Sequence, residues 1–305
     1  MSTQFDLIIV GGGPAGLTAA IYARRAGRSV LVLEKAAVGG QIAASPRVDN
    51  YPGLPGVSGA ELADRLFEQA MALGAQLELE EVLELRDGTP KTVVTDYNTY
   101  TGSALILAAG MTHRTLGLPR EEALAGVSYC AVCDGAFYQG KDVAVCGGGN
   151  TALQDALYLA DLCRQVTVIH RRQEFRGDPI LVEALRQRPN VAFALDTVVD
   201  ALLGDTALTG LRMRHLVSGQ ITELPVSGLF QAVGQQPQTA LAASLLVLDE
   251  DGFLPAGEDC LTAVPGVFAA GDCRTKAVRQ LTTACADGAA AALAAIQFLT
   301  EQAAR

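Results

Sequence analysis

The chain has 305 residues, which is enough for two domains of ordinary size that each bury a core. Half of the residues are hydrophobic and only 18% are charged, so long disordered stretches are excluded. The net charge of −10 disfavours a nucleic-acid partner, because an acidic surface repels the phosphate backbone.

The N-terminal residues show no targeting segment, because polar residues lead directly into a strand-like run at residues 6–10. The apolar run at residues 284–294 is short, and Asp287 and Gly288 interrupt it, so we expect no membrane span. The seven cysteines are irregularly spaced, which is not typical of a disulfide scaffold. We therefore expect a cytoplasmic protein.

A glycine turn joins the first predicted strand, residues 6–10, to an alanine-rich helix predicted at residues 17–26. Gly11 permits a tight turn after the strand, and Gly13 lets the backbone approach a pyrophosphate at the helix N-terminus. Gly16 lets the helix and the strand pack closely. The pattern predicts a dinucleotide site, the alternative being a glycine-rich turn without a ligand.

Glu34 ends the next predicted strand, which covers residues 29–33. A carboxylate at this place accepts hydrogen bonds from ribose hydroxyls and repels a 2′-phosphate. The first nucleotide-binding unit is therefore expected to bind FAD or NAD.

Cys130 and Cys133 are separated by two residues, and Asp134 follows them. This spacing lets two sulfur atoms cycle between a dithiol and a disulfide, and the carboxyl group is a candidate proton donor or acceptor. A zinc site would need two further ligands at regular spacing, which the sequence does not offer. Two ordinary cysteines near a turn are the remaining alternative. Of the other cysteines, Cys146 and Cys163 are expected to be small core residues. Cys260, Cys273 and Cys285 are scattered, and no function is expected for them, although Cys273 could lie near a flavin.

The second half of the chain repeats the design of the first. Residues 142–152 resemble residues 6–16, and the same offset pairs Glu34 with His170. His170 leads into three closely spaced arginines, Arg171, Arg172 and Arg176. Guanidinium groups can bind a 2′-phosphate in bidentate fashion, so the second unit is expected to bind NADPH. The alternative is a solvated basic loop.

Further buried strands define the expected domain division. Residues 104–110 and 228–234 are apolar runs that end in glycine, and residues 265–272 are another, which ends in Gly-Asp. The last run is interpreted as the returning half of the first unit. We expect an α/β fold with two Rossmann-like dinucleotide-binding domains, the second inserted in the first. The FAD-binding domain would comprise residues 1–112 and 245–305, and the NADPH-binding domain residues 113–244.

With these motifs in order, the chain resembles the low-molecular-weight thioredoxin reductases over nearly its whole length. The matching segments are residues 11–16, 39–41, 50–53, 130–135, 147–152, 170–176, 266–272 and 279–280. The resemblance implies that electrons pass from NADPH through FAD to the cysteine pair, and then to the disulfide of a thioredoxin-type protein. It implies a homodimer, and a rotation of the inserted domain that brings either the nicotinamide or the cysteines to the flavin.

The resemblance also implies residue roles. Cys133 would be the sulfur nearer the flavin, with Asp134 as the acid–base group. Asp272 would bond the ribityl chain or phosphate region of FAD, and Arg279 and Gln280 would meet the pyrimidine end of the isoalloxazine. With the positions argued above, the expected FAD-binding residues are Gly11, Gly13, Pro14, Ala15, Gly16, Glu34, Lys35, Gly40, Gln41, Asn50, Ala109, Gly110, Gly271, Asp272, Arg279 and Gln280. The expected NADPH-binding residues are Gly147, Gly149, Asn150, Thr151, His170, Arg171, Arg172 and Arg176.

Some positions depart from the family pattern, among them Ala109, Gly177 and residues 43–45, of which the last could alter hydrogen bonding to the flavin. None of these changes removes an expected catalytic group. Three related activities remain as alternatives: a flavoprotein dithiol oxidase, the reductase of a peroxidase system, and a reductase fed by ferredoxin. A non-enzymatic redox sensor that binds nucleotides is an alternative of a different class.

Overall fold

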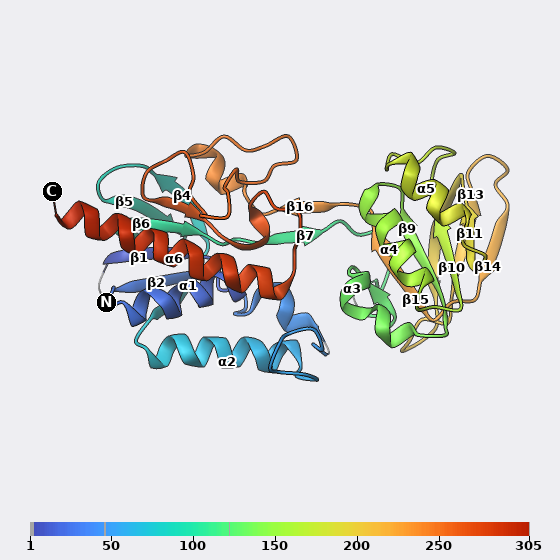
Figure 1. Ribbon diagram of the computed structural model, residues 1–305, viewed down its shortest axis with the longest axis horizontal. Helices are drawn as coiled ribbons and strands as arrows, with labels where there is room; N and C mark the ends of the chain where they lie inside the picture. Colours follow the sequence, from blue (N-terminus) through green and yellow to red (C-terminus); the bar gives the residue numbers. More distant parts are fainter. Residues whose placement is uncertain (1–2, 46, 122, 305) are drawn as a thin grey trace. The chain divides into compact units, whose positions relative to one another are not determined.

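The computed structural model describes residues 3–45, 47–121 and 123–304. The chain divides into two compact units (Figure 1). Unit 1 comprises Met1–Thr112 with Gln236–Arg305, and unit 2 comprises His113–Gln235. Both units have a parallel sheet with helices, which confirms the expected α/β class.

Unit 1 is built on a sheet with the strand order β3-β2-β1-β6-β5-β4, in which β17 also pairs with β6. β1, β2, β3, β6 and β17 run parallel, whereas β4 and β5 are antiparallel to their neighbours. The strands are β1 Gln4–Val10, β2 Val30–Glu34, β3 Gln76–Leu79, β4 Val82–Arg86, β5 Lys91–Thr95, β6 Thr99–Leu107 and β17 Val267–Ala269. The helical segments are α1 Pro14–Arg25, η1 Gly40–Ala44, α2 Gly59–Ala72, η3 Ala240–Ser244, η4 Gly271–Cys273 and α6 Leu281–Ala303.

The central strands of this sheet are apolar because both of their faces are covered. Along β1, Leu7 and Ile9 pack into one hydrophobic cluster with α1 and α6, whereas Ile8 packs into a second cluster on the other face. The carboxyl ends of β1, β6 and β17 meet at one edge of the sheet, since these strands are parallel. The loops that follow them therefore come together at that edge.

Helix α6 is longer than the apolar run in the sequence suggests. By length and composition alone it could cross a membrane, with a mean hydropathy of 1.3 over its most apolar window. Its Ala291, Ala292 and Ala295 are buried in the core that also contains α1. Asp287 in the same helix binds two buried cations. The core helix of a globular domain passes the same test of length and composition.

Unit 2 contains a parallel sheet with the strand order β11-β10-β9-β15-β8 and a separate antiparallel sheet of β12, β13 and β14. The parallel strands are β8 Val127–Ser128, β9 Asp142–Gly147, β10 Gln165–Ile169, β11 Val191–Ala194 and β15 Gly228–Ala232. The antiparallel strands are β12 Thr197–Leu203, β13 Gly210–His215 and β14 Ile221–Leu224. The helical segments are α3 Ala131–Asp134, η2 Gly135–Tyr138, α4 Asn150–Ala160 and α5 Pro179–Arg186.

The chain crosses between the units through two short paired strands, β7 Met111–His113 and β16 Gln235–Pro237. The division falls at residues 235–236, whereas the sequence placed the end of the second domain at residue 244. The physical reason is that η3 packs on β4 of unit 1, where the Ser244 hydroxyl donates to the Leu85 carbonyl at 3.3 Å.

Candidate functional site

The first glycine turn is too tight for any side chain at two of its positions. Gly11 has a φ of +112°, and a Cβ on it would lie 2.3 Å from the Ala108 carbonyl oxygen. A Cβ on Gly16 would lie 1.9 Å from the Gly11 carbonyl oxygen. Pro14 and Ala15 begin α1, and Gly13 caps it in extended conformation without a side-chain cap. The turn therefore leaves the backbone N–H groups at the helix N-terminus open to an anion.

Replacing Gly16 by Ala is expected to destabilise unit 1, because strand β1 and helix α1 must separate to admit the methyl group. Overpacking of this kind costs about 1–3 kcal/mol. The second unit offers a matched contrast, because Ala152 occupies the equivalent place there. G16A should unfold at a lower temperature than the unaltered protein, and it should bind FAD more weakly. A152G should change FAD binding little. Equal FAD affinity of G16A and the unaltered protein would contradict the close-packing argument.

Glu34 is held against this glycine turn by the end of β2. One of its carboxylate oxygens accepts from the Gly12 N–H at 2.8 Å, and the other accepts from the Ala36 N–H at 3.0 Å. A Cβ on Gly12 would lie 3.1 Å from that of Glu34. The Glu34 carboxylate is thus fixed beside the turn, and its oxygens still have lone pairs that can accept further hydrogen bonds. Lys35, the next residue, is exposed.

Two further segments reach the same edge of the sheet as the glycine turn. Ala109 and Gly110 follow β6, and Gly271 and Asp272 follow β17. Gly271 has a φ of +77°, and a Cβ on it would lie 2.9 Å from the Ala15 side chain. Asp272 carries a carboxylate oxygen, Oδ1, that is buried without a hydrogen-bond partner among the described residues. Burial raises the pKa of this carboxyl group, while the charges of Lys276 and Arg279 oppose that shift.

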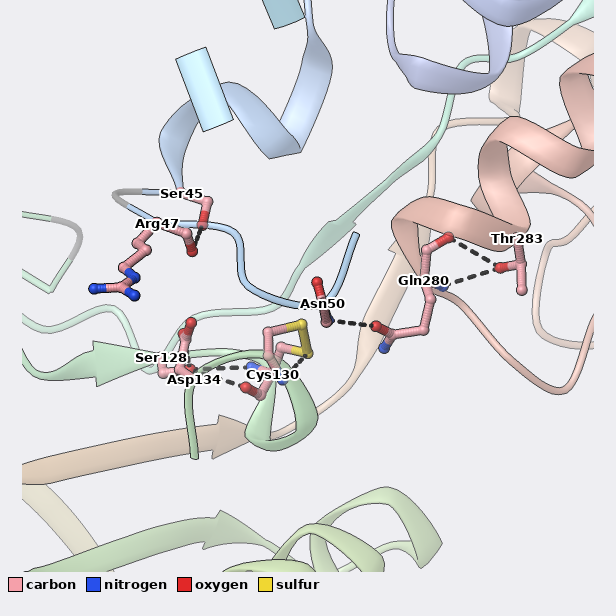
Figure 2. The surroundings of a disulfide bond; sticks show 9 residues. Ser45, Arg47, Asn50, Ser128, Cys130, Asp134, Gln280 and Thr283 are labelled. Carbon is pink, nitrogen blue, oxygen red and sulfur yellow. Dashed lines mark hydrogen bonds between the residues drawn. A yellow bond between two sulfur atoms is a disulfide. The ribbon is translucent and has the colours of Figure 1, made fainter. Parts of the chain in front are cut away.

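Unit 1 also contains four polar residues of the expected FAD site, namely Gln41, Asn50, Arg279 and Gln280. Gln41 lies in η1, which begins at Gly40, and its amide donates to the Met111 carbonyl. Asn50 donates to the Gln280 side chain at 3.3 Å (Figure 2). Gln280 caps α6 in a reciprocal arrangement with Thr283. Arg279 lies over the Phe253 ring, 4.0 Å from its centre, and donates to the Asp272 carbonyl.

These features of unit 1 fit a flavin dinucleotide. The glycine turn offers N–H donors for a pyrophosphate, Glu34 offers acceptors for ribose hydroxyls, and Asp272 has a buried oxygen that lacks a donor. Buried polar atoms in native proteins normally have partners, so the bare oxygen of Asp272 indicates a ligand donor.

The second glycine turn has the same geometry at the end of β9. A Cβ on Gly147 would lie 2.5 Å from the Ala232 carbonyl oxygen, and Gly149 caps α4 in extended conformation. Asn150 begins that helix, and its side-chain oxygen accepts from the Asp178 N–H at 2.7 Å. Thr151 is exposed beside it. Asn150 therefore fixes the following loop, a contact that the sequence did not predict.

His170 and the three arginines have different surroundings. The His170 ring is buried, stacks on Phe175, and fills the space where a Cβ on Gly148 would lie, 2.1 Å from its Cε1. Burial lowers its pKa, a hydrogen bond to the Glu174 carbonyl opposes this, and the neighbouring arginine charges lower it further. Arg171, Arg172 and Arg176 are exposed, and none forms a salt bridge with the described residues. In an acidic chain these free guanidinium groups suit an anionic ligand such as a 2′-phosphate.

Cys130 and Cys133 form a disulfide, with their Cα atoms 5.3 Å apart, as α3 begins. Cys133 is exposed and Cys130 is half-buried. The Asp134 carboxylate accepts from the Ser128 hydroxyl at 2.6 Å (Figure 2). Burial raises the pKa of Asp134, while the hydrogen bond from Ser128 opposes the shift. The arrangement places a redox pair beside a carboxyl group that retains its proton at higher pH than usual.

Ser128 is a site residue that the sequence did not reveal. Its hydroxyl holds Asp134 and also accepts from the Cys130 N–H at 3.2 Å. A serine two residues before a cysteine pair carries no signal in its spacing, so no pattern could have found it. The remaining cysteines are free; Cys146, Cys163, Cys260 and Cys273 are buried, and Cys285 is half-buried.

Comparison with known proteins identifies the family of this chain. The family model "Pyridine nucleotide-disulphide oxidoreductase" matches residues 5–288. The chain is 42% identical to the thioredoxin reductase of Mycolicibacterium smegmatis over 98% of each chain. It is also 42% identical to the bifunctional thioredoxin reductase/thioredoxin of Mycobacterium leprae, covering 99% of this chain and 67% of that protein.

A solved structure, that of thioredoxin reductase from Streptococcus pyogenes, matches with a TM-score of 0.95 and 37% identity. The match covers 99% of this chain and 100% of that one. The predicted fold with two dinucleotide-binding Rossmann-like domains is thereby confirmed. The chain therefore belongs to the pyridine nucleotide-disulphide oxidoreductase family, and within that family to the thioredoxin reductases.

Proposed function

We propose that this chain reduces the disulfide of a thioredoxin with electrons from NADPH, which pass through FAD and then through the Cys130–Cys133 disulfide. The observation that carries the proposal is this disulfide, formed beside Asp134 in a chain with two dinucleotide-type turns. Unit 1 would hold FAD and unit 2 NADPH. NADPH supplies a hydride and FAD passes the electrons on, so the protein itself must provide binding, the thiols and a proton.

Asp134 has the properties of the proton donor. Opening one disulfide takes up two electrons and two protons and gives two thiols. Ser128 occupies one carboxyl oxygen of Asp134 and leaves the other free to carry a proton. The raised pKa of Asp134 keeps that proton on the carboxyl group at higher pH than in an ordinary aspartate. A cysteine thiolate can then attack the disulfide of thioredoxin through a mixed disulfide, which the second cysteine resolves.

Replacing Asp134 by Asn is expected to lower the rate of thioredoxin reduction about 10²–10⁴-fold, because the amide cannot donate and accept this proton. The variant should also change stability with pH. Because burial raises the pKa of Asp134 in the folded chain, the free energy of unfolding falls as pH rises through that pKa. D134N should lose this pH dependence. Unfolding and turnover measured from pH 4 to 9 test both effects, and an unchanged pH profile would count against the assignment.

The family relationship supports a proposal for the partner and for the assembly. The Mycobacterium leprae relative carries thioredoxin in its name together with the reductase, which supports a thioredoxin as the electron acceptor. We propose a homodimer located in the cytoplasm, without nucleic-acid or membrane partners. We also propose that the units rotate through the β7 and β16 connection during turnover. A cross-link between the units should then block turnover, and sedimentation measurements test the dimer.

The identity of the bound flavin tests whether unit 1 binds FAD, on which the proposed function depends. Heat denaturation of the purified yellow protein should release FAD, since Glu34 and the glycine turn can act only on a dinucleotide. Release of FMN alone, or a colourless protein that binds no flavin, would overturn it. A dithiol oxidase would reduce oxygen with small dithiols and would not need Arg171 and Arg172.

A further inference from the structure

Unit 1 contains a buried ion cluster that the proposed mechanism does not use. Asp287 of α6 accepts from Nε and Nη2 of Arg274, both at 2.8 Å, and from Nζ of Lys276, also at 2.8 Å. The side chains of Arg274, Lys276 and Asp287 are 2%, 5% and 6% exposed. Burial raises the pKa of Asp287, but the hydrogen bonds from the two cations outweigh burial and lower it. The cluster is therefore charged and sealed from solvent.

The same carboxylate holds the backbone next to the expected flavin site. Asp287 Oδ2 accepts from the Gly271 N–H at 3.0 Å, and Gly271 directly precedes Asp272. The neighbouring Gly288 lets α6 approach α1, since a Cβ on Gly288 would lie 2.1 Å from the Ala15 carbonyl oxygen. One turn of α6 thus joins the first glycine turn to the Gly271–Asp272 turn.

Oδ1 of Asp272 has no partner in the part of the chain that the structure describes, although cations lie near it. The charges of Lys276 and Arg279 both act on its pKa, yet its Oδ1 has no hydrogen-bond partner among the described residues. Lys276 is bound by Asp287, and Arg279 donates to backbone carbonyls instead. Lys276 Nζ donates to the same Asp287 oxygen as the N–H of Gly271, the residue before Asp272, so Asp287 holds this cation beside Asp272 but not on it.

We propose that Asp287 is a positioning residue for FAD binding: it holds Lys276 away from Asp272, so that the Asp272 carboxylate stays free for the hydroxyl groups of the flavin's sugar chain. The inference rests on the proposed function, because it assumes that unit 1 binds FAD. Its physical basis is that a buried ammonium group left without its carboxylate must find another partner. Asp272 is the available one, and an Asp272–Lys276 pair would occupy the oxygen that the ligand needs.

The test uses the full-length apoprotein, prepared by removing bound flavin, with FAD affinity measured from the quenching of flavin fluorescence. D287N should bind FAD about tenfold more weakly or worse, which corresponds to about 1.4 kcal/mol. The double variant D287N/K276M should recover most of the affinity, because Lys276 is no longer present to pair with Asp272 and Arg279 is held by backbone carbonyls. E258Q is the matched control, since Glu258 lies 3.5 Å from Arg274 but is 96% exposed. Its FAD affinity should not change.

The double variant decides between positioning and a merely structural role. If Asp287 only stabilised the fold, removing Lys276 as well would not restore FAD affinity. Equally weak FAD binding by D287N and D287N/K276M would therefore overturn the inference. Circular dichroism shows whether each apoprotein folds. If D287N does not fold, the double variant alone is decisive, because the inference predicts that the negative charge of Asp287 is dispensable for FAD binding once Lys276 is absent. Failure of the unaltered protein to bind FAD would instead remove the proposed function itself.

Discussion

Replacing Cys133 by Ser is expected to abolish thioredoxin reduction, with kcat lowered by at least about 10³-fold, because the nucleophilic pair acts as a unit. The same loss is expected for C130S, since neither sulfur can form the internal disulfide alone. NADPH should still bleach the flavin absorbance of both variants, because the cysteines act after the flavin in the proposed sequence.

The control for this experiment is C163S, which changes a buried cysteine outside the proposed site. It should retain turnover if it folds. Thioredoxin reduction at the normal rate by C133S would show that Cys130–Cys133 is not the redox pair. A loss of flavin bleaching in both variants would mean that the cysteines act earlier than proposed.

Replacing Arg171 and Arg172 together by Ala is expected to remove most of the preference for NADPH over NADH. Each charge-assisted hydrogen bond contributes about 1.5–3 kcal/mol, and solvent exposure reduces that value at this site. We therefore expect kcat/KM for NADPH to fall about 10- to 100-fold, whereas kcat/KM for NADH should change little.

R186A is the matched control, because Arg186 is an exposed arginine of unit 2 at the carboxyl end of α5, the opposite end from the Asp178 that contacts Asn150. It should leave the ratio of the two cofactors unchanged. Equal use of NADPH and NADH by the unaltered protein would contradict the assignment of the 2′-phosphate site. An equal loss with both cofactors in the double variant would point to a structural role for the arginines.

The duplicated nucleotide-binding design could be predicted because each copy is a local pattern. A short apolar strand, a glycine turn and an alanine-rich helix lie within about 20 residues, and their geometry follows from steric limits on the turn. Both turns are present in the structure, and no side chain would fit at Gly11, Gly16 or Gly147. The roles assigned to individual cofactor-binding residues remain predictions.

Contacts between residues far apart in the chain could not be predicted from the sequence. Asp287 stands in the sequence as an interruption of an apolar run, whereas in the structure it is the centre of a buried ion cluster. Its partners Arg274 and Lys276 lie before α6, and the sequence has no periodic pattern there that would predict the conformation of the loop. The end of unit 2 was missed for a similar reason, because the packing of η3 on β4 joins segments about 160 residues apart.

The most direct test of the proposed electron path is anaerobic stopped-flow mixing of the purified protein with NADPH, followed by addition of oxidised thioredoxin. The proposed electron path predicts that NADPH bleaches the flavin absorbance and that thioredoxin restores it while gaining two thiols per molecule. A protein that NADPH does not reduce, or one whose reduced form returns electrons to oxygen but not to thioredoxin, would contradict the proposal.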